Sequence, residues 1–186
     1  EAFNCESLQE IFVINEMAHL HGVKANISVR INPDIDAHTH KYVTTGLYEN
    51  KFGISNHEFD KLIEFIQKSE HINFFGLHFH IGSQITRVKE VFSLECQRVN
   101  EIVKYFESKG LTVNNINLGG GLGVDYDDPD GSPIADFETW FNAISDNIVR
   151  RKDQTVHVEP GRSLVAQCAS LISRVVFVKS GETKNF

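Results

Sequence analysis

Residues 72–84 read INFFGLHFHIGSQ, and this stretch decides the fold that the sequence predicts. Its apolar run over residues 72–81 ends at Gly82, as expected of a buried strand followed by a turn. An amphipathic pattern over residues 89–109 then predicts a long helix, which Gly110 can end. The passage from a buried strand to an amphipathic helix is typical of one β–α unit of a parallel sheet.

The same pattern of strand and helix recurs along the rest of the chain. Strands are predicted at five positions: residues 3–5, 26–31, 72–81, 115–118 and 155–158. Two helices are expected to begin at capping-box spacings, Ser7 with Glu10 and Ser55 with Glu58, and another helix is predicted over residues 134–150. The regular spacing of the last three strands favours right-handed crossovers and a parallel α/β sheet.

A sheet of this kind is either doubly wound or closed into a (β/α)8 TIM barrel. Because such a barrel takes about 250 residues, these 186 residues would form a partial barrel that lacks its first strands. Residues 169–179 are rich in aliphatic side chains and no helix follows them, which predicts a strand leading into a β domain. We therefore expect a barrel portion over residues 1–165 and the start of a C-terminal β domain over residues 166–186. The polar loop over residues 33–53 is long enough to be functional.

Composition argues against several classes of partner. The chain has 18 lysines and arginines against 25 aspartates and glutamates, a net charge of −7, and no basic cluster that would bind nucleic acid. No apolar run approaches the roughly 20 residues of a membrane span, and no signal peptide is visible at the start. Cys5, Cys96 and Cys168 lack any CxxC spacing, so we expect reduced, mostly buried thiols in a cytoplasmic protein.

The first candidate site lies at the end of the strand that contains His78 and His80. These side chains share one face, because side chains on a strand repeat every second residue. His80 is then at the strand mouth, where an imidazole can lie flat on a planar ligand, and the hydroxyl of Ser83 can donate to an anion. The alternative is a core or surface histidine followed by an ordinary turn.

The second candidate site is the run Gly119, Gly120 and Gly121, which follows the strand over residues 115–118 directly. Glycines there let the backbone approach a ligand, and their N–H groups can form an anion-binding concavity. Because the run lacks both the GxGxxG register and the GK[ST] of a P-loop, dinucleotide and nucleoside-triphosphate sites are poorly supported. A plain glycine-rich turn stays an alternative.

The third candidate site is the turn forced by Pro160 and Gly161, with Glu159 and Arg162 at one rim. Glu159 can hold a proton on a ring nitrogen, and Arg162 can grip a phosphate or carboxylate. The two could instead form a structural ion pair. Taken together, the three strand ends suit a phosphorylated aromatic cofactor.

In order and spacing, these motifs resemble those of the fold type III pyridoxal-phosphate decarboxylases. The motifs are residues 78–84 (HFHIGSQ), 119–123 (GGGLG) and 159–163 (EPGRS). Other segments resemble the diaminopimelate decarboxylases in particular: residues 3–7 (FNCES), 30–34 (RINPD), 38–46 and 51–54 (KFGI). The resemblance covers essentially the whole chain.

The resemblance implies a barrel of alanine racemase type with a second β domain, a homodimer, and pyridoxal 5'-phosphate as cofactor. The implied reaction is decarboxylation of meso-2,6-diaminopimelate to L-lysine and CO2, in lysine biosynthesis. His80 would stack on the pyridine ring, while Ser83 and the three glycines at 119–121 would hold the phosphate. Glu159 would pair with the pyridine nitrogen. Arg162, together with Pro160 and Gly161, would contact the cofactor anion or the substrate.

Two features of that family have no counterpart in the sequence. The family's Schiff-base lysine lies on an early strand that is missing here, and Lys24 is expected to face solvent at the opposite end of the barrel. The cysteine that the dimer partner contributes is also absent. We therefore expect the chain by itself to be inactive.

Three alternatives stay open from the sequence. One is decarboxylation of another basic amino acid: ornithine, arginine or carboxynorspermidine. Another is a metal-dependent TIM-barrel hydrolase that uses His78, His80, His157 and Glu159, although the cation of Arg162 would disfavour a metal there. The last is a non-catalytic piece that only binds cofactor or a partner.

Overall fold

A computed structural model describes residues 2–35, 52–132 and 134–185. The described residues form a five-stranded sheet with the order β1-β2-β3-β4-β5, and every pairing in it is parallel. The strands are β1 (Phe3–Cys5), β2 (Ala25–Arg30), β3 (Ile72–His78), β4 (Asn115–Asn117) and β5 (Thr155–His157). Because consecutive strands are always neighbours, the order never reverses as it does in a doubly wound sheet. The architecture is therefore α/β and that of part of a TIM barrel.

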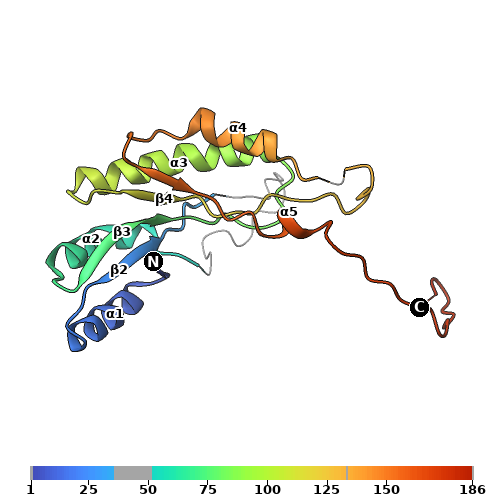
Figure 1. The fold of residues 1–186 in the computed structure, drawn as a ribbon, viewed down its shortest axis with the longest axis horizontal. Helices are drawn as coiled ribbons and strands as arrows, with labels where there is room; N and C mark the ends of the chain where they lie inside the picture. The colour runs from blue at the N-terminus through green and yellow to red at the C-terminus, as the bar shows by residue number, and fades with distance from the viewer. Residues whose placement is uncertain (1, 36–51, 133, 186) are drawn as a thin grey trace.

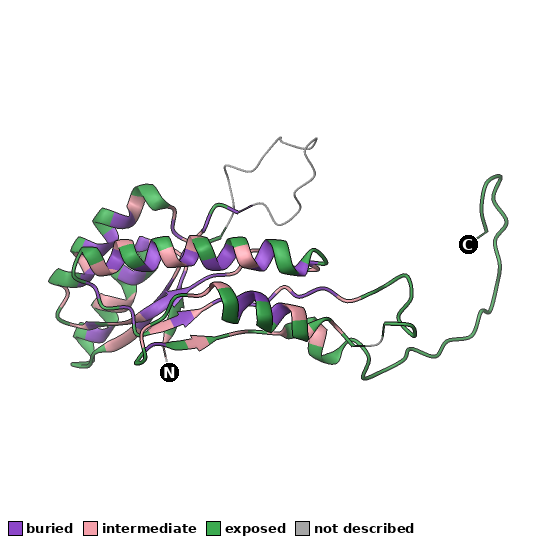
Figure 2. Ribbon diagram, turned by 90° about the horizontal axis from the view of Figure 1, so that it is seen from above, coloured by how far each residue is buried: buried purple, intermediate pink, exposed green. Residues whose placement is uncertain are grey.

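Helices connect the strands and cover the sheet (Figure 1). They are α1 (Leu8–Leu20), the 3-10 helix η1 (Asn56–Glu58), α2 (Phe59–Lys68), α3 (Val88–Ser108), α4 (Phe137–Asn147) and α5 (Gly161–Val165). The core is formed by aliphatic and aromatic side chains of the strands and of the helix faces that lie against them, as the buried stripes in Figure 2 show. The helices α3 and α4 lie side by side, with the Phe92 and Trp140 rings 5.6 Å apart between centroids.

Helix ends follow the sequence prediction in some places and depart from it in others. Ser7 caps α1 as predicted, since its Oγ accepts the Glu10 N–H at 3.2 Å, but the Glu10 carboxylate accepts from Glu6 N–H. The second predicted capping box is wrong, because Ser55 makes no side-chain cap and precedes the 3-10 turn η1. Gly110, with φ at +88°, directly follows the C-cap of α3, as predicted.

The predicted helix over residues 134–150 is shorter than expected. It spans Phe137–Asn147, and its first turn is capped by Asp136, whose carboxylate accepts the Thr139 N–H at 3.0 Å. Of the three cysteines, Cys5 and Cys96 are buried as predicted, whereas Cys168 is exposed. No helix among the described residues is both long and apolar enough to cross a membrane.

The C-terminal segment after α5 runs away from the sheet (Figures 1 and 2). The predicted strand over residues 169–179 is not formed, because no neighbouring strand lies within reach to complete its hydrogen bonds among the described residues. Its apolar side chains are open to solvent: Leu171 is 96% exposed and Phe177 is 88% exposed. The division into a barrel portion and a β domain stays a prediction.

Candidate functional site

The three strand ends singled out in the sequence meet at the carboxyl edge of the sheet. Backbone contacts join them: the Glu159 N–H donates to the Gly119 carbonyl at 2.6 Å, and the Gly120 N–H donates to Nδ1 of His80 at 3.3 Å. On the far side of the glycine run, Gly121 lies against the carbonyl of Gly82. The loops after β3, β4 and β5 thus form one continuous rim.

Two glycines are required by the closeness of these loops. A Cβ at Gly120 would lie 1.9 Å from the Glu159 carbonyl oxygen, and one at Gly119 would lie 2.3 Å from that of Phe79. Gly119 also has φ at +67°, a conformation that favours glycine. The packing of the loops is therefore sufficient to explain why these two positions are glycine, without any contact to a ligand.

The glycine run offers fewer N–H groups to an anion than the sequence suggested. The Gly119 N–H donates to Oδ1 of Asn117 at 2.8 Å, and the Gly120 N–H is taken by His80. Within the described part of the chain, neither the Gly121 N–H nor the Ser83 hydroxyl has a hydrogen-bond partner. The expected anion site is therefore narrowed to Gly121 and Ser83.

His80 presents a neutral ring at this rim. Burial lowers the pKa of His80, and the positive charge of Arg30 lowers it further, while Glu159 acts in the opposite direction. Because Nδ1 accepts the Gly120 N–H, the neutral ring carries its proton on Nε2. A neutral imidazole held in this way can stack on a planar ligand.

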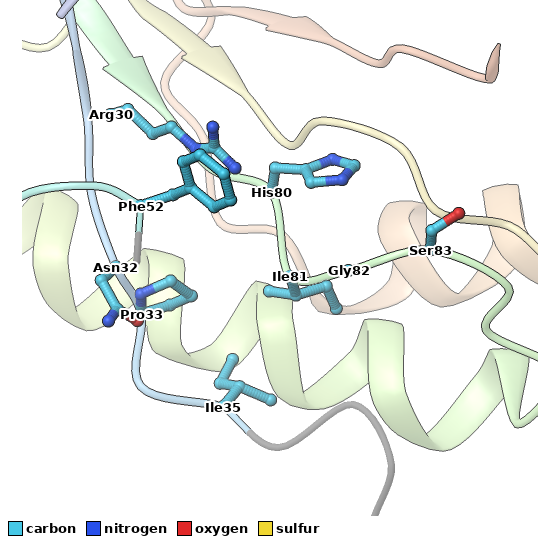
Figure 3. A pocket seen from close by; sticks show the side chains of 9 residues that line it. All are labelled: Arg30, Asn32, Pro33, Ile35, Phe52, His80, Ile81, Gly82 and Ser83. Atoms are coloured by element: carbon cyan, nitrogen blue, oxygen red, sulfur yellow. The ribbon is translucent and has the colours of Figure 1, made fainter. Parts of the chain in front are cut away.

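A cavity of about 280 Å³ opens beside His80. Figure 3 shows the side chains that line it: Arg30, Asn32, Pro33, Ile35, Phe52, His80, Ile81, Gly82 and Ser83. The guanidinium of Arg30 lies 5.0 Å from the centroid of the Phe52 ring and also forms an ion pair with Glu6. Arg30 begins the RINPD segment but was not predicted as an individual site residue.

The Glu159 carboxylate is hydrogen-bonded by a side chain of β4 and lies beside one of β3. Nδ2 of Asn117 donates to Oε1 at 2.8 Å, and Nε2 of His78 lies 3.5 Å from Oε2. The Glu159 side chain is still 48% exposed, so one side of the carboxylate is open to a ligand. Asn117 was not predicted as a site residue, because its only signal in the sequence is a polar side chain at the end of a buried strand.

Arg162 does not form the structural ion pair with Glu159 that the sequence left open. Its Nη1 donates to Oε1 of Gln84 at 3.3 Å, and its guanidinium lies 5.9 Å from the centroid of the Tyr126 ring. Pro160 is the N-cap of the short helix α5, so the predicted turn begins a helix that starts at Gly161.

Gln84 is a second residue at the site that was not predicted from the sequence. Its amide forms a reciprocal pair with Val124, with Nε2 donating to the carbonyl at 2.5 Å and Oε1 accepting the N–H at 3.3 Å. Its φ of +62° is unusual for a residue other than glycine and marks a constrained position at the site. Gln84 thereby joins the loop after β3 to the loop after β4 and to Arg162.

Other sequence predictions concern residues away from this rim. The segments 38–46 and Lys51 lie outside the described residues. Lys24 is exposed, as predicted, and precedes β2 at the opposite edge of the sheet. The metal-site alternative gains no support, because no three His, Cys, Asp or Glu side chains gather into a possible metal site within residues 2–35, 52–132 and 134–185.

Comparison with known proteins gives the family of the chain. The family described as "Pyridoxal-dependent decarboxylase, pyridoxal binding domain" matches residues 1–166. The chain belongs to the pyridoxal-dependent decarboxylase family. The cofactor of this family is pyridoxal 5'-phosphate, whose ring, ring nitrogen and phosphate suit the donors and acceptors found here: the His80 ring, the Glu159 carboxylate, and the Gly121 N–H with the Ser83 hydroxyl.

Similar members of the family are diaminopimelate decarboxylases. The Bacteroides thetaiotaomicron protein of that name is 47% identical over 99% of this chain and 47% of its own length, and the Pseudomonas aeruginosa protein is 40% identical over 99% and 43%. The crystal structure of the Helicobacter pylori diaminopimelate decarboxylase complexed with L-lysine is 36% identical and has a TM-score of 0.77, over 99% of this chain and 45% of that one. The corresponding M. jannaschii complex with L-lysine has 33% identity and a TM-score of 0.79, over 99% and 43%. The chain therefore spans less than half the length of these relatives.

Proposed function

We propose that this chain is the cofactor-binding part of a diaminopimelate decarboxylase, which releases CO2 from meso-2,6-diaminopimelate and leaves L-lysine. The observation that carries the proposal is the meeting of His80, Gly121 and Glu159 at one rim, in a chain whose relatives bear that name. The relatives are more than twice as long as this chain. In this proposal, the additional residues supply the remaining barrel strands, which would pair with the edge strands β1 and β5. They also supply a C-terminal β domain after residue 165.

Each residue at the rim has a distinct part in holding the cofactor. The flat face of His80 supports the pyridine ring, and its neutral state avoids placing a second cation against a protonated ring. The Ser83 hydroxyl and the Gly121 N–H donate to the phosphate. Arg162, fixed by Gln84 and beside Pro160 and Gly161, supplies positive charge to the same anion or to a substrate carboxylate.

Glu159 controls the charge of the cofactor ring. When bound, pyridoxal phosphate supplies an electron sink for the carbanion that loss of CO2 leaves behind. That sink is strongest when the ring nitrogen keeps its proton, and a carboxylate beside the nitrogen favours the protonated form. The open side of the Glu159 carboxylate is suited to accept that N–H.

The same proposal covers the location, oligomeric state, pathway and substrate of the whole protein. We place it in the cytoplasm as a homodimer that takes part in lysine biosynthesis, with no nucleic acid or membrane as partner. Ornithine, arginine and carboxynorspermidine are the competing substrates. L-Lysine in two of the related crystal structures favours the diaminopimelate reaction, because L-lysine is its product.

A hybrid protein tests the function. Residues 1–186 replace the matching part of the Bacteroides thetaiotaomicron enzyme, and CO2 release is measured from meso-diaminopimelate, ornithine and arginine. We expect release from diaminopimelate, at least a hundredfold loss in a Glu159→Ala hybrid, and no turnover by the 186-residue chain alone. A folded, cofactor-loaded hybrid that prefers ornithine or arginine would overturn the substrate assignment.

A further inference from the structure

His78 is a buried polar residue at the rim, and the proposed function gives it no role. It is the last residue of β3, and only 6% of it is exposed. It stands in register with Arg30 on β2 and with Asn117 on β4. Neither of its ring nitrogens has a hydrogen-bond partner among the described residues. A buried ring with an unsatisfied nitrogen weakens folding, so its presence points to a purpose other than stability.

One ring nitrogen of His78 faces the carboxylate that the proposed function uses. Nε2 of His78 lies 3.5 Å from Oε2 of Glu159, while Nδ2 of Asn117 reaches Oε1 at 2.8 Å. Asn117 thus donates to one oxygen of the carboxylate, and the unpartnered Nε2 of His78 lies beside the other, from the adjacent strand. The contact from His78 is long for a hydrogen bond, as contacts in ligand-free sites often are before a ligand draws them together.

The Asn117 amide cannot rotate without breaking hydrogen bonds to two residues. Its Oδ1 accepts the Gly119 N–H at 2.8 Å, which leaves Nδ2 as the group that donates to Glu159. The Glu159 N–H in turn donates to the Gly119 carbonyl at 2.6 Å. These three bonds close a ring that fixes one oxygen of the carboxylate, and His78 lies beside the other oxygen.

The His78 ring is neutral, so it can donate a hydrogen bond to Glu159 without neutralising the carboxylate. Burial lowers the pKa of His78, Glu159 opposes that shift, and the nearby cation of Arg30 and the ring of His80 add to it. The ring is therefore neutral at neutral pH and can donate one N–H without cancelling the negative charge. An imidazolium at this place would compete with a protonated pyridine nitrogen for the same carboxylate.

We infer that His78 is a positioning residue that, together with Asn117, aims the Glu159 carboxylate at the ring nitrogen of the cofactor. The inference rests on the proposed function, because it gives Glu159 the same part. It separates the two histidines of the HFH motif, since His80 contacts the cofactor and His78 acts through Glu159.

Cofactor-free spectra test the contact by itself. In the 15N-labelled chain, we expect the His78 ring to carry its proton on Nε2 and to titrate below the ordinary histidine range. Glu159→Gln removes the negative charge that raises the pKa of His78, so the His78 midpoint should fall further in this variant. A His78 ring that does not respond to Glu159→Gln would overturn the inference, whatever the cofactor does.

Binding of 4'-deoxypyridoxine 5'-phosphate tests the consequence. This probe has the ring nitrogen and phosphate of the cofactor but no aldehyde, so it cannot react with surface lysines. We expect about tenfold weaker binding to His78→Phe, as for one lost hydrogen bond to a charged group. The ultraviolet spectrum of the bound probe should also show its ring nitrogen losing its proton at lower pH. His78→Gln, which keeps a donor, should restore both, and His157→Phe is the matched control.

The outcomes separate the two proposals. If the unaltered chain binds the probe and His78→Phe behaves like His157→Phe, the positioning role is wrong and the proposed function stands. If the unaltered chain does not bind the probe, the cofactor site itself is wrong and the positioning role fails with it. Because His78→Phe removes an unsatisfied buried nitrogen, we expect its unfolding midpoint to equal or exceed that of the unaltered chain, which distinguishes weaker binding from loss of fold.

Discussion

The backbone of Gly120 lies against that of Glu159, and a Cβ at Gly120 would meet the Glu159 carbonyl oxygen at 1.9 Å. The closeness of these two residues joins the loop after β4 to the loop after β5. It also fixes the position of the Glu159 backbone, and therefore the region that the Glu159 carboxylate can reach. The glycine run consequently serves the candidate site through the protein's own packing.

Replacing Gly120 with alanine should therefore damage both the fold and the site. We expect Gly120→Ala to lower the free energy of unfolding by about 1–3 kcal/mol, as for overpacking of a tight contact, measured by urea unfolding. Gly161→Ala is the matched control, because nothing lies within 4 Å of a Cβ there. Equal stability of the two variants would show that the loops are further apart than the structure places them.

Ser7 and Ser55 offer a test of the helix starts. Both begin a capping-box spacing, but only the Ser7 hydroxyl caps a helix. Ser7→Ala should cost about 1 kcal/mol of unfolding free energy, whereas Ser55→Ala should cost less than about 0.5 kcal/mol. A larger loss from Ser55→Ala than from Ser7→Ala would contradict the described helix starts.

Glu95 should make stability depend on pH. It lies on α3 with 0% exposure, neither carboxylate oxygen has a partner among the described residues, and burial raises its pKa well above the ordinary value of 4.5. The folded chain then holds a proton that the unfolded chain releases, so this group lowers stability as pH rises above about 4.5, with a slope of at most about 1.4 kcal/mol per pH unit.

Glu95→Gln removes that ionisation and nearly keeps the shape of the side chain. We expect the variant to gain stability over the unaltered chain at pH 7.5, and to gain less or nothing at pH 4.5, in parallel urea unfolding experiments. A gain of the same size at both pH values would mean that Glu95 does not carry its proton in the folded chain.

Gln84 links three loops, so its loss should weaken anion binding more than folding. Its amide pairs with Val124 and accepts from Arg162. We expect Gln84→Ala to weaken binding of 4'-deoxypyridoxine 5'-phosphate by about three- to tenfold, as for the loss of a modest hydrogen bond. Gln167→Ala is a suitable control, because Gln167 donates to the Pro129 carbonyl away from the rim. Equal binding by the two variants would remove Gln84 from the site.

The sequence predicted the strands and most helices because their apolar patterns are local. The periodicity around β3 and α3 needs no knowledge of the rest of the chain, and the predicted boundaries differ from the described ones by only a few residues. Ser55 shows the limit of such patterns, since the spacing of a capping box permits a cap but does not require one. The strand predicted over residues 169–179 failed for a different reason, because a strand exists only with a neighbour that pairs with it.

Some residues of the candidate site could be predicted from local sequence patterns, and others could not. His80 and Glu159 could be picked out because strand ends and neighbouring turns are visible in sequence. Asn117 and Gln84 could not, since their parts depend on hydrogen bonds to residues about 40 positions away along the chain. The glycine run was found, but its main contacts are with neighbouring loops, which only the three-dimensional arrangement reveals.

The most direct test of the account asks whether one ligand touches all three strand ends. The 15N-labelled chain is titrated with 4'-deoxypyridoxine 5'-phosphate, and the amide signals of Ser83, Gly121 and Arg162 are followed, with exposed Lys24 as the reference at the opposite edge of the sheet. The account predicts that the three signals shift together, with one dissociation constant, while Lys24 does not move. Shifts confined to one of the three loops, or equally large at Lys24, would contradict it.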